Sequence, residues 1–131
     1  MYRPVAHNGG VLAPTRIWHI DDPEHYRVFR EVTEESTFEV GVGLPGRILE
    51  SGEPAWIANV QVDPNFPRNR ISADIGVKGA FGLPVKIRNE TVAVLEFFTD
   101  VEMEPDEALL RVMRNVGVQL GRVFELSLIH I

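Results

Sequence analysis

The fold is decided by a stretch at positions 41–60 that reads Gly41-Val42-Gly43-Leu44-Pro45-Gly46-Arg47-Ile48-Leu49-Glu50-Ser51-Gly52-Glu53-Pro54-Ala55-Trp56-Ile57-Ala58-Asn59-Val60. Pro45 suits the start of a helix, where its missing N–H would have no partner anyway, and Gly52 can end that helix by adopting a positive φ. Because a proline forces extended backbone on the residue before it, the Glu53-Pro54 step predicts that the apolar residues 55–58 form a short strand. A loop, a short helix and a strand therefore follow one another closely. No catalytic group lies between them, which favours a regulatory or binding module over an enzyme.

The composition is that of one globular domain. A chain of 131 residues with 44% hydrophobic and 24% charged residues can bury a single core. The net charge of −6 disfavours a phosphate-binding surface, so no nucleic-acid partner is expected. The chain has no cysteine, which excludes disulfides, thiolate catalysis and cysteine-based zinc sites. It also has no signal-peptide pattern and no apolar run of about 18 residues. We therefore expect a cytoplasmic domain without membrane contact.

The first third of the chain predicts a hairpin and a helix. Residues 1–5 and 11–20 are expected to pair around Asn8-Gly9, because both turn residues tolerate a positive φ. Asp22-Pro23 then offers an N-cap and a first-turn proline for an amphipathic helix that runs to about Glu35.

The rest of the chain predicts a second hairpin with helices around it. Residues 59–70 are polar and bounded by prolines, which indicates a loop with a large aromatic residue at its middle. A brief helix over 71–75, a hairpin of strands 79–87 and 91–100, and a helix over 105–126 follow. Because residues 92–98 are apolar at both parities, layers are expected on both faces of the sheet. These patterns predict a central antiparallel sheet with the last helix on one face.

Five motifs in this order resemble a GAF domain of the type found in bacterial sensor histidine kinases and cyclases. They are the opening stretch, Asp63-Pro64-Asn65-Phe66-Pro67-Arg68, Gly79-Ala80-Phe81-Gly82-Leu83-Pro84-Val85, Val92-Ala93-Val94-Leu95-Glu96-Phe97-Phe98 and Glu104-Pro105-Asp106-Glu107. An ordered series is far more specific than one short motif. The resemblance implies an α+β fold of the GAF/PAS-like (profilin-like) type, with a central antiparallel β-sheet and helices on both faces.

The resemblance also bears on where the domain begins and ends. Because GAF domains usually start with a helix and a full first strand, the N-terminal helix and part of the first strand are expected to be missing. Residues 1–126 would then form a single, N-terminally truncated GAF-like domain. Residues 127–131 match no family feature, so a non-native or read-through tail is expected there.

The function implied by the resemblance is that of a regulatory sensor. An unidentified small molecule would bind between the sheet and residues 59–76, and the terminal helix would relay the signal to an effector of a longer parent protein, such as a histidine kinase. The ligand-binding residues expected are Trp56, Phe66, Arg68, Ile71, Ile75, Phe81, Leu83 and Glu96. A homodimer is expected through the C-terminal helix at Leu110, Gly117 and Gly121.

The aromatic and basic candidates each have a structural alternative. Phe66, Trp56 and Phe81 line a pocket in one interpretation and are ordinary core aromatics in the other. Arg68 and Arg70 either neutralise an anionic ligand or are solvated loop charges.

Two further features have alternatives of the same kind. Glu96 lies within a doubly covered strand, where a carboxylate needs a partner, so it serves either as a structural anchor or in ligand binding and switching. Gly117 and Gly121 either admit a second helix or lie against the sheet of their own chain.

No cofactor or metal is expected. His7, His19, His25 and His130 are scattered without a recognisable ligand spacing. The lack of cysteine excludes thioether attachment of a bilin and the chemistry by which related proteins reduce free methionine sulfoxide, while noncovalent pigment binding stays open. The Asn-Lys-x-Asp motif of cyclic-nucleotide-binding relatives is also absent. The main alternative to a sensor is a ligand-free GAF domain that serves as a dimerisation or spacer module.

Overall fold

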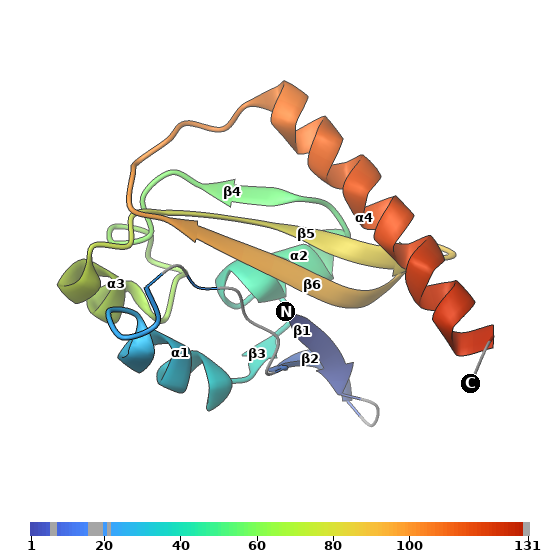
Figure 1. Cartoon of the computed structure of the whole chain (residues 1–131), viewed down its shortest axis with the longest axis horizontal. Helices are drawn as coiled ribbons and strands as arrows, with labels where there is room; N and C mark the ends of the chain where they lie inside the picture. Colours follow the sequence, from blue (N-terminus) through green and yellow to red (C-terminus); the bar gives the residue numbers. More distant parts are fainter. Residues whose placement is uncertain (6–7, 16–19, 21, 130–131) are drawn as a thin grey trace.

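The computed structural model describes residues 1–5, 8–15, 20 and 22–129, and these form an α+β fold around one antiparallel sheet (Figure 1). The sheet has the strand order β3-β2-β1-β6-β5-β4. Its strands are β1 (Tyr2–Val5), β2 (Asn8–Pro14), β3 (Phe38–Glu39), β4 (Ala55–Ile57), β5 (Gly79–Ile87) and β6 (Glu90–Thr99). The helices are α1 (Arg27–Glu34), α2 (Gly43–Ser51), α3 (Asn69–Ile75) and α4 (Glu107–Ile129).

The two faces of the sheet carry separate cores. On one face α4 packs against β5, and the buried residues are Leu83, Val85, Ala93 and Met113. On the other face α1, α2 and the segment around α3 cover a larger core with residues from all six strands. Its buried residues are Tyr2, Leu12, Phe29, Phe38, Leu44, Ile48, Ile57, Val60, Phe66, Val77, Ala80 and Val94. The predicted layers on both sides of the sheet are therefore present.

The β5–β6 hairpin is the framework of the sheet. Arg88 and Asn89 form its turn with φ values of 54° and 69°, the two positive values that a tight two-residue hairpin turn requires. The strands pair from Gly79 opposite Thr99 to Ile87 opposite Glu90, with one register shift between Val85 and Lys86. The predicted hairpin is thus confirmed, with β6 starting one residue earlier than expected.

Residues 41–60 form the expected loop, helix and strand. α2 ends at Gly52, which has a φ of 67°, and β4 follows at Ala55–Ile57. The helix begins at Gly43, so Pro45 is its third residue instead of its first. This position still lies in the first turn, where a missing N–H leaves no hydrogen bond unmade.

Several bounds near the N-terminus differ from the prediction. Asn8 and Gly9 belong to β2 instead of the turn, while residues 6–7 and 16–19 lie outside the described part of the chain. α1 begins at Arg27, because Asp22 caps a preceding turn by accepting a hydrogen bond from the His25 N–H at 3.2 Å.

Two differences also occur further along. α4 continues to Ile129, three residues beyond the predicted end. Phe97 in β6 is 42% exposed, so residues 92–98 are not covered along the whole strand. The reason is that α4 crosses the sheet at its other end (Figure 1). No helix of the described residues is both long and apolar enough to cross a membrane.

Replacing Gly121 by alanine tests how closely α4 sits on the sheet. A Cβ at this position would lie 1.7 Å from the Lys86 carbonyl oxygen. Helix propensity alone predicts that Gly121→Ala stabilises the protein by about 1 kcal/mol, whereas this contact predicts a loss of about 1–3 kcal/mol. Urea denaturation distinguishes the signs. Val118→Ala on the exposed side of α4 is the control, and a Gly121→Ala variant as stable as wild type would contradict the close seating.

Candidate functional site

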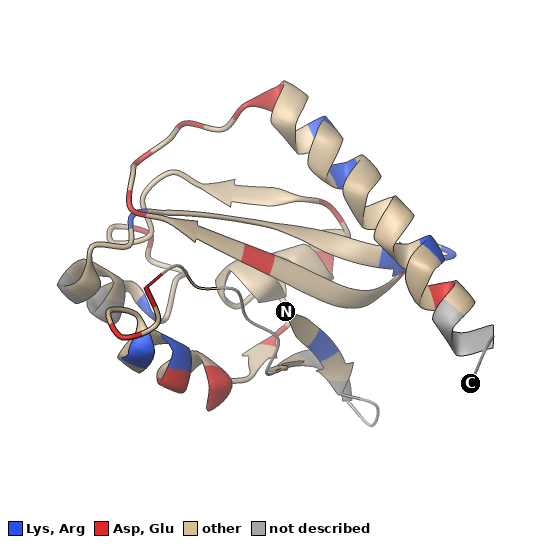
Figure 2. Cartoon of the chain, viewed as in Figure 1, with Lys and Arg blue, Asp and Glu red and all other residues tan. Residues whose placement is uncertain are grey.

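The most unusual feature of the interior is a buried arginine surrounded by aromatic rings. Most charged residues lie on helices and connecting segments, while the strands are largely uncharged (Figure 2). Arg68 lies on such a connecting segment, but only 3% of its surface is exposed. Its guanidinium carbon lies 4.8–5.3 Å from four ring centroids, those of Phe29, Phe38, Phe66 and Phe98. Aromatic faces attract a cation at such distances.

The charge of Arg68 is balanced by Glu96. Arg68 Nη2 donates to Glu96 Oε2 at 2.8 Å and Nη1 donates to Oε1 at 3.1 Å, which is the bidentate geometry of a strong pair. Only 2% of each side chain is exposed. Tyr2 donates its hydroxyl to the same carboxylate, and Arg68 Nη1 also lies 3.1 Å from Thr33 Oγ1 and 3.2 Å from Tyr2 Oη.

The local structure explains why these side chains meet. Successive residues of a strand point to opposite faces, so Val94, Glu96 and Phe98 of β6 all face the larger core. Tyr2 pairs with Val94 across β1 and β6, which brings its hydroxyl near Glu96. Arg68 is the residue that precedes α3, at the end of the proline-bounded loop. The cluster therefore joins the sheet, α1 and the 59–76 segment.

Burial and charge shift the pKa values in this cluster. Burial acts to lower the pKa of Arg68, but the Glu96 carboxylate and Tyr2 more than offset it, so the pKa of Arg68 is raised. Burial raises the pKa of the Tyr2 phenol well above its usual value, and the Glu96 charge adds to this effect. At neutral pH the arginine is charged and the tyrosine is a hydrogen-bond donor.

A second set of contacts holds the 59–76 segment against residues 41–47. Arg47 forms an ion pair with Asp63 and donates to the Asn65 carbonyl oxygen at 3.0 Å. The Asn65 side chain accepts from the Gly43 N–H at 3.0 Å and donates to the Gly41 carbonyl oxygen at 2.9 Å. Sequence reasoning missed these roles, although all five residues lie in two of the quoted motifs.

The structure brings together three of the predicted ligand-binding residues. Phe66, Arg68 and Glu96 meet in the buried cluster, and Ile75 packs at the edge of the same core. The side chains of Ile71 and Arg70 lie outside the described ones.

Trp56, Phe81 and Leu83 lie elsewhere, which corrects the predicted pocket. Trp56 stacks on Phe81 with ring centroids 4.9 Å apart, and both pack with Leu83 in the core under α4. Because strand residues alternate between faces, these positions of β4 and β5 point away from Phe66. The sheet separates them from the cluster, so they do not share a pocket with it.

The predicted dimer residues face the sheet of their own chain. A Cβ on Gly117 would lie 2.1 Å from the Pro84 carbonyl oxygen, and one on Gly121 would meet the Lys86 carbonyl oxygen. Leu110 packs in the core under α4. The two glycines let the helix approach the sheet, which was the alternative interpretation, and leave no room at these residues for a second helix.

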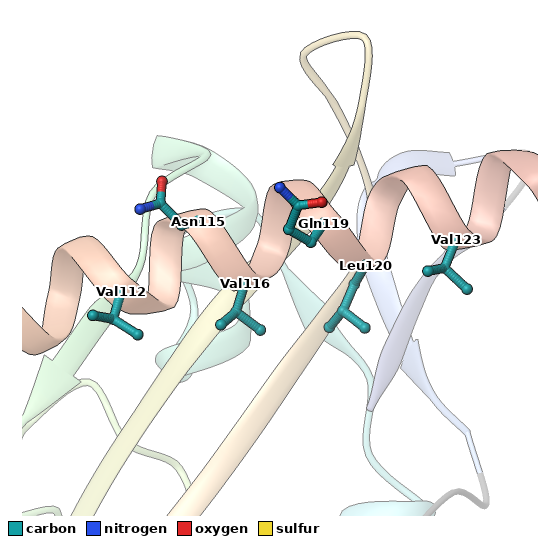
Figure 3. Close-up of a pocket in the computed structure, with 6 residues that line it drawn as sticks. All are labelled: Val112, Asn115, Val116, Gln119, Leu120 and Val123. Atoms are coloured by element: carbon teal, nitrogen blue, oxygen red, sulfur yellow. The ribbon is translucent and has the colours of Figure 1, made fainter.

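The described residues form two notable surface hollows. One of about 320 Å³ follows the outer side of α4 and is lined by Val112, Asn115, Val116, Gln119, Leu120 and Val123 (Figure 3). The other, of about 240 Å³, is lined by Pro14, Thr15, Glu31, Glu34 and Glu35. Neither lies beneath Phe66, where Arg68 and the aromatic rings fill the space. No group of three or more candidate metal ligands occurs among the described residues, and His19 lies outside them.

Comparison with known sequences identifies the family. The model of the family described as GAF domain matches residues 7–125, so the chain belongs to the GAF domain family. GAF domains generally serve as regulatory sensor modules. Among curated proteins, Protein NLP8 of Arabidopsis thaliana is 29% identical over 117 residues. The match covers 78% of this chain but only 12% of NLP8.

Solved structures share the fold. Free methionine-R-sulfoxide reductase from Neisseria meningitidis, solved with its substrate, has a TM-score of 0.71 and 14% identity, covering 99% of this chain and 68% of that chain. The nlh2 GAF domain of A. aeolicus in an inactive state has a TM-score of 0.56 and 22% identity, covering 70% of this chain and 59% of that chain. The predicted α+β GAF fold is thus confirmed, and an enzyme is among the structures that share it.

Removing one member of the buried pair should cost far more stability than removing both. Arg68→Met leaves an unpaired carboxylate in the core, which we expect to destabilise the protein by about 3–5 kcal/mol. The double variant Arg68→Met/Glu96→Met removes the unpaired charge and should recover part of that loss. Urea denaturation of both single variants and the double variant measures the coupling. Simple additivity of the two single losses would contradict a tightly coupled pair.

Proposed function

We propose that this chain is a cytoplasmic regulatory sensor module that binds a small molecule between the sheet and residues 59–76. The observation that carries the proposal is the junction of Arg68 with Glu96. It ties the connection between β4 and α3 to the central strand β6. A group that changes this junction changes how the segment sits on the sheet. A ligand acts on such an equilibrium only through its different affinities for the two arrangements.

The signal would leave the domain through α4. The cluster and α4 lie on opposite faces of the same two strands, since Glu96 points to one face and its neighbour Leu95 packs under α4. Gly117 and Gly121 seat the helix directly on carbonyl groups of β5. Because no side chain lies between the helix backbone and the β5 carbonyl groups at these two glycines, a shift of β5 and β6 would move the helix. The effector, for example a histidine kinase of a bacterial two-component system, would lie outside this chain.

The proposal includes a homodimer that uses the exposed side of α4. Leu109, Val112, Val116, Gln119, Val123 and Leu126 recur at intervals of three and four residues, which is the spacing of a coiled-coil seam. The five apolar members are 37–57% exposed. Leu109, Val116 and Val123 fall at one seam position, and Val112, Gln119 and Leu126 fall at the other. This seam replaces the glycine positions as the proposed interface.

A charged residue on this seam should dissociate the dimer. Val116 and Val118 are each 41% exposed, but only Val116 belongs to the seam. We expect Val116→Glu to weaken dimerisation by at least tenfold, because two buried like charges would face each other. Val118→Glu is the matched control and should leave the dimer intact. Sedimentation equilibrium measures both, and a monomeric wild-type chain or equal effects of the two variants would contradict the seam.

A ligand-free spacer module is the second candidate, and the packed interior favours it. Arg68 fills the space beneath Phe66 with its own side chain. A catalytic role is not proposed. The Neisseria neighbour is a methionine sulfoxide reductase, but this chain has no cysteine to supply thiol chemistry.

A thermal-shift screen separates the sensor from the spacer. A ligand present at about 100 times its dissociation constant stabilises the folded state by about 2.7 kcal/mol, which gives a clear shift. The library includes cyclic nucleotides, amino acids, amines, aromatic acids and tetrapyrroles. We expect at least one hit that Phe66→Ala abolishes, while Phe97→Ala on the opposite face keeps it. Silence across the library, together with a stable dimer, would support the spacer instead.

A further inference from the structure

The buried cluster consists of a fixed part, held by the sheet and α1, and of Arg68, which comes from a connecting segment. Glu96 and Phe98 belong to β6, which is paired on both sides, and Tyr2 belongs to the neighbouring β1. Phe29 and Thr33 lie on α1, and Phe38 lies on β3. Arg68, in contrast, comes from the connection that precedes the short helix α3. Withdrawing the guanidinium requires a movement of this connection alone, whereas withdrawing Glu96 requires breaking the sheet.

The fixed part has the chemistry of a cation receptor. Its carboxylate is 2% exposed and would be an unpaired buried charge without Arg68. Phe29, Phe38 and Phe98 present their rings to the same point at 4.9–5.3 Å from the guanidinium carbon. A carboxylate framed by aromatic rings attracts ammonium, amidinium and guanidinium groups. An anion at this position would face the charge of Glu96, so the anionic ligand considered for Arg68 is disfavoured.

Arg68 does not satisfy this receptor completely. Its Nε is buried without a hydrogen-bond partner among the described residues, and so is the hydroxyl of Ser72 one turn further along α3. Both groups without a partner belong to α3 and the connection before it. The polar side chains of the fixed part, those of Glu96, Tyr2 and Thr33, all form hydrogen bonds. An unpaired buried donor makes the closed arrangement less favourable than a fully bonded one. A competing ligand therefore has less to overcome.

We propose that the site is a receptor for an organic cation and that Arg68 occupies it in the absence of ligand. This inference rests on the proposed sensor function and names its ligand class, an amine, amidine or guanidine. The ligand cation takes the place of the guanidinium on Glu96 and among the rings. Arg68 then moves outward with the 59–76 segment, so that binding and the structural response are one event. The net charge of −6 favours the approach of a cation.

Emptying the site tests the receptor directly. Arg68→Ala is titrated with methylguanidine, and isothermal calorimetry measures binding, with methylurea as the uncharged probe of the same shape and sodium chloride to match ionic strength. We expect saturable binding at least tenfold tighter than to wild type, because Arg68 no longer competes. Adding Glu96→Gln to the variant should abolish the binding. Arg47→Ala is the matched control, since it frees a different carboxylate, that of Asp63, outside the aromatic cluster.

An unstable variant is equally informative. If Arg68→Ala is unfolded alone, methylguanidine and not methylurea should restore its near-ultraviolet circular dichroism. A variant that shows neither binding nor rescue, or that responds no better than Arg47→Ala, overturns the receptor.

Measurements on the wild-type chain distinguish a failure of the cation receptor from a failure of the proposed sensor function. Agmatine and other alkylguanidines should stabilise wild type weakly and lose this effect with Phe98→Ala, because the Phe98 ring belongs to the fixed part of the cluster. If anionic or neutral compounds stabilise wild type through Phe66 while cations do not, the cation assignment fails and the sensor stands. If no compound stabilises wild type and the emptied variant does not bind methylguanidine, both fail.

Discussion

The ion pair of Arg68 with Glu96 is the interaction on which this domain depends. Two charges held in the interior, with the Nη2–Oε2 distance at 2.8 Å and 2% of each side chain exposed, are stable only as long as both are present. The pair joins residues 28 positions apart and draws in Tyr2 and Thr33 from the N-terminal third of the chain. Packing on this face of the sheet is therefore organised around a polar centre with aromatic walls, instead of a purely apolar core.

The sheet gives its two faces different tasks. One face carries the charged cluster and the 59–76 segment, and the other carries α4. Alternation along β6 places Glu96 and Leu95 on opposite sides, so neighbouring residues of one strand belong to the two layers. At Gly117 and Gly121 the helix backbone lies directly on carbonyl groups of β5, and Met113 packs into the core beside them. This arrangement provides a short and stiff connection between a site on one face and a helix on the other.

A site that is filled by a side chain of its own chain would couple ligand binding to a conformational change. In a preformed empty pocket, a ligand binds without displacing anything, and its signal requires a separate conformational change. In the proposed receptor a ligand would compete with Arg68, so its apparent affinity would fall in proportion to the fraction of time that the site is open. The displaced side chain and its segment would supply the conformational change. The hydrogen bonds of Asn65 with Arg47 and Gly43 would then limit how far that segment can move.

The sequence by itself determined the elements that depend on local chemistry. The helix that ends at Gly52, the strand after Pro54 and the β5–β6 hairpin follow from φ preferences and from the period of apolar residues. The ordered motifs were enough to recognise the GAF fold, because they span most of the chain. Glu96 stood out as a carboxylate in an apolar strand, and its need for a partner was evident without the partner being known.

Long-range packing determines which side chains lie on the same face of the sheet and contact one another. The spacing of Trp56, Phe81 and Phe66 cannot reveal that the sheet runs between them, since that depends on strand register. The partner of Glu96 could not be chosen in advance either, because Arg68 and Arg70 flank the same helix start and carry the same charged group. The exposed and buried stripes of α4 are both apolar, so the sheet contact of Gly117 had to be seen. In each case the local sequence is compatible with more than one packing arrangement. Contacts between segments far apart in the sequence determine which arrangement forms, and no single segment contains that information.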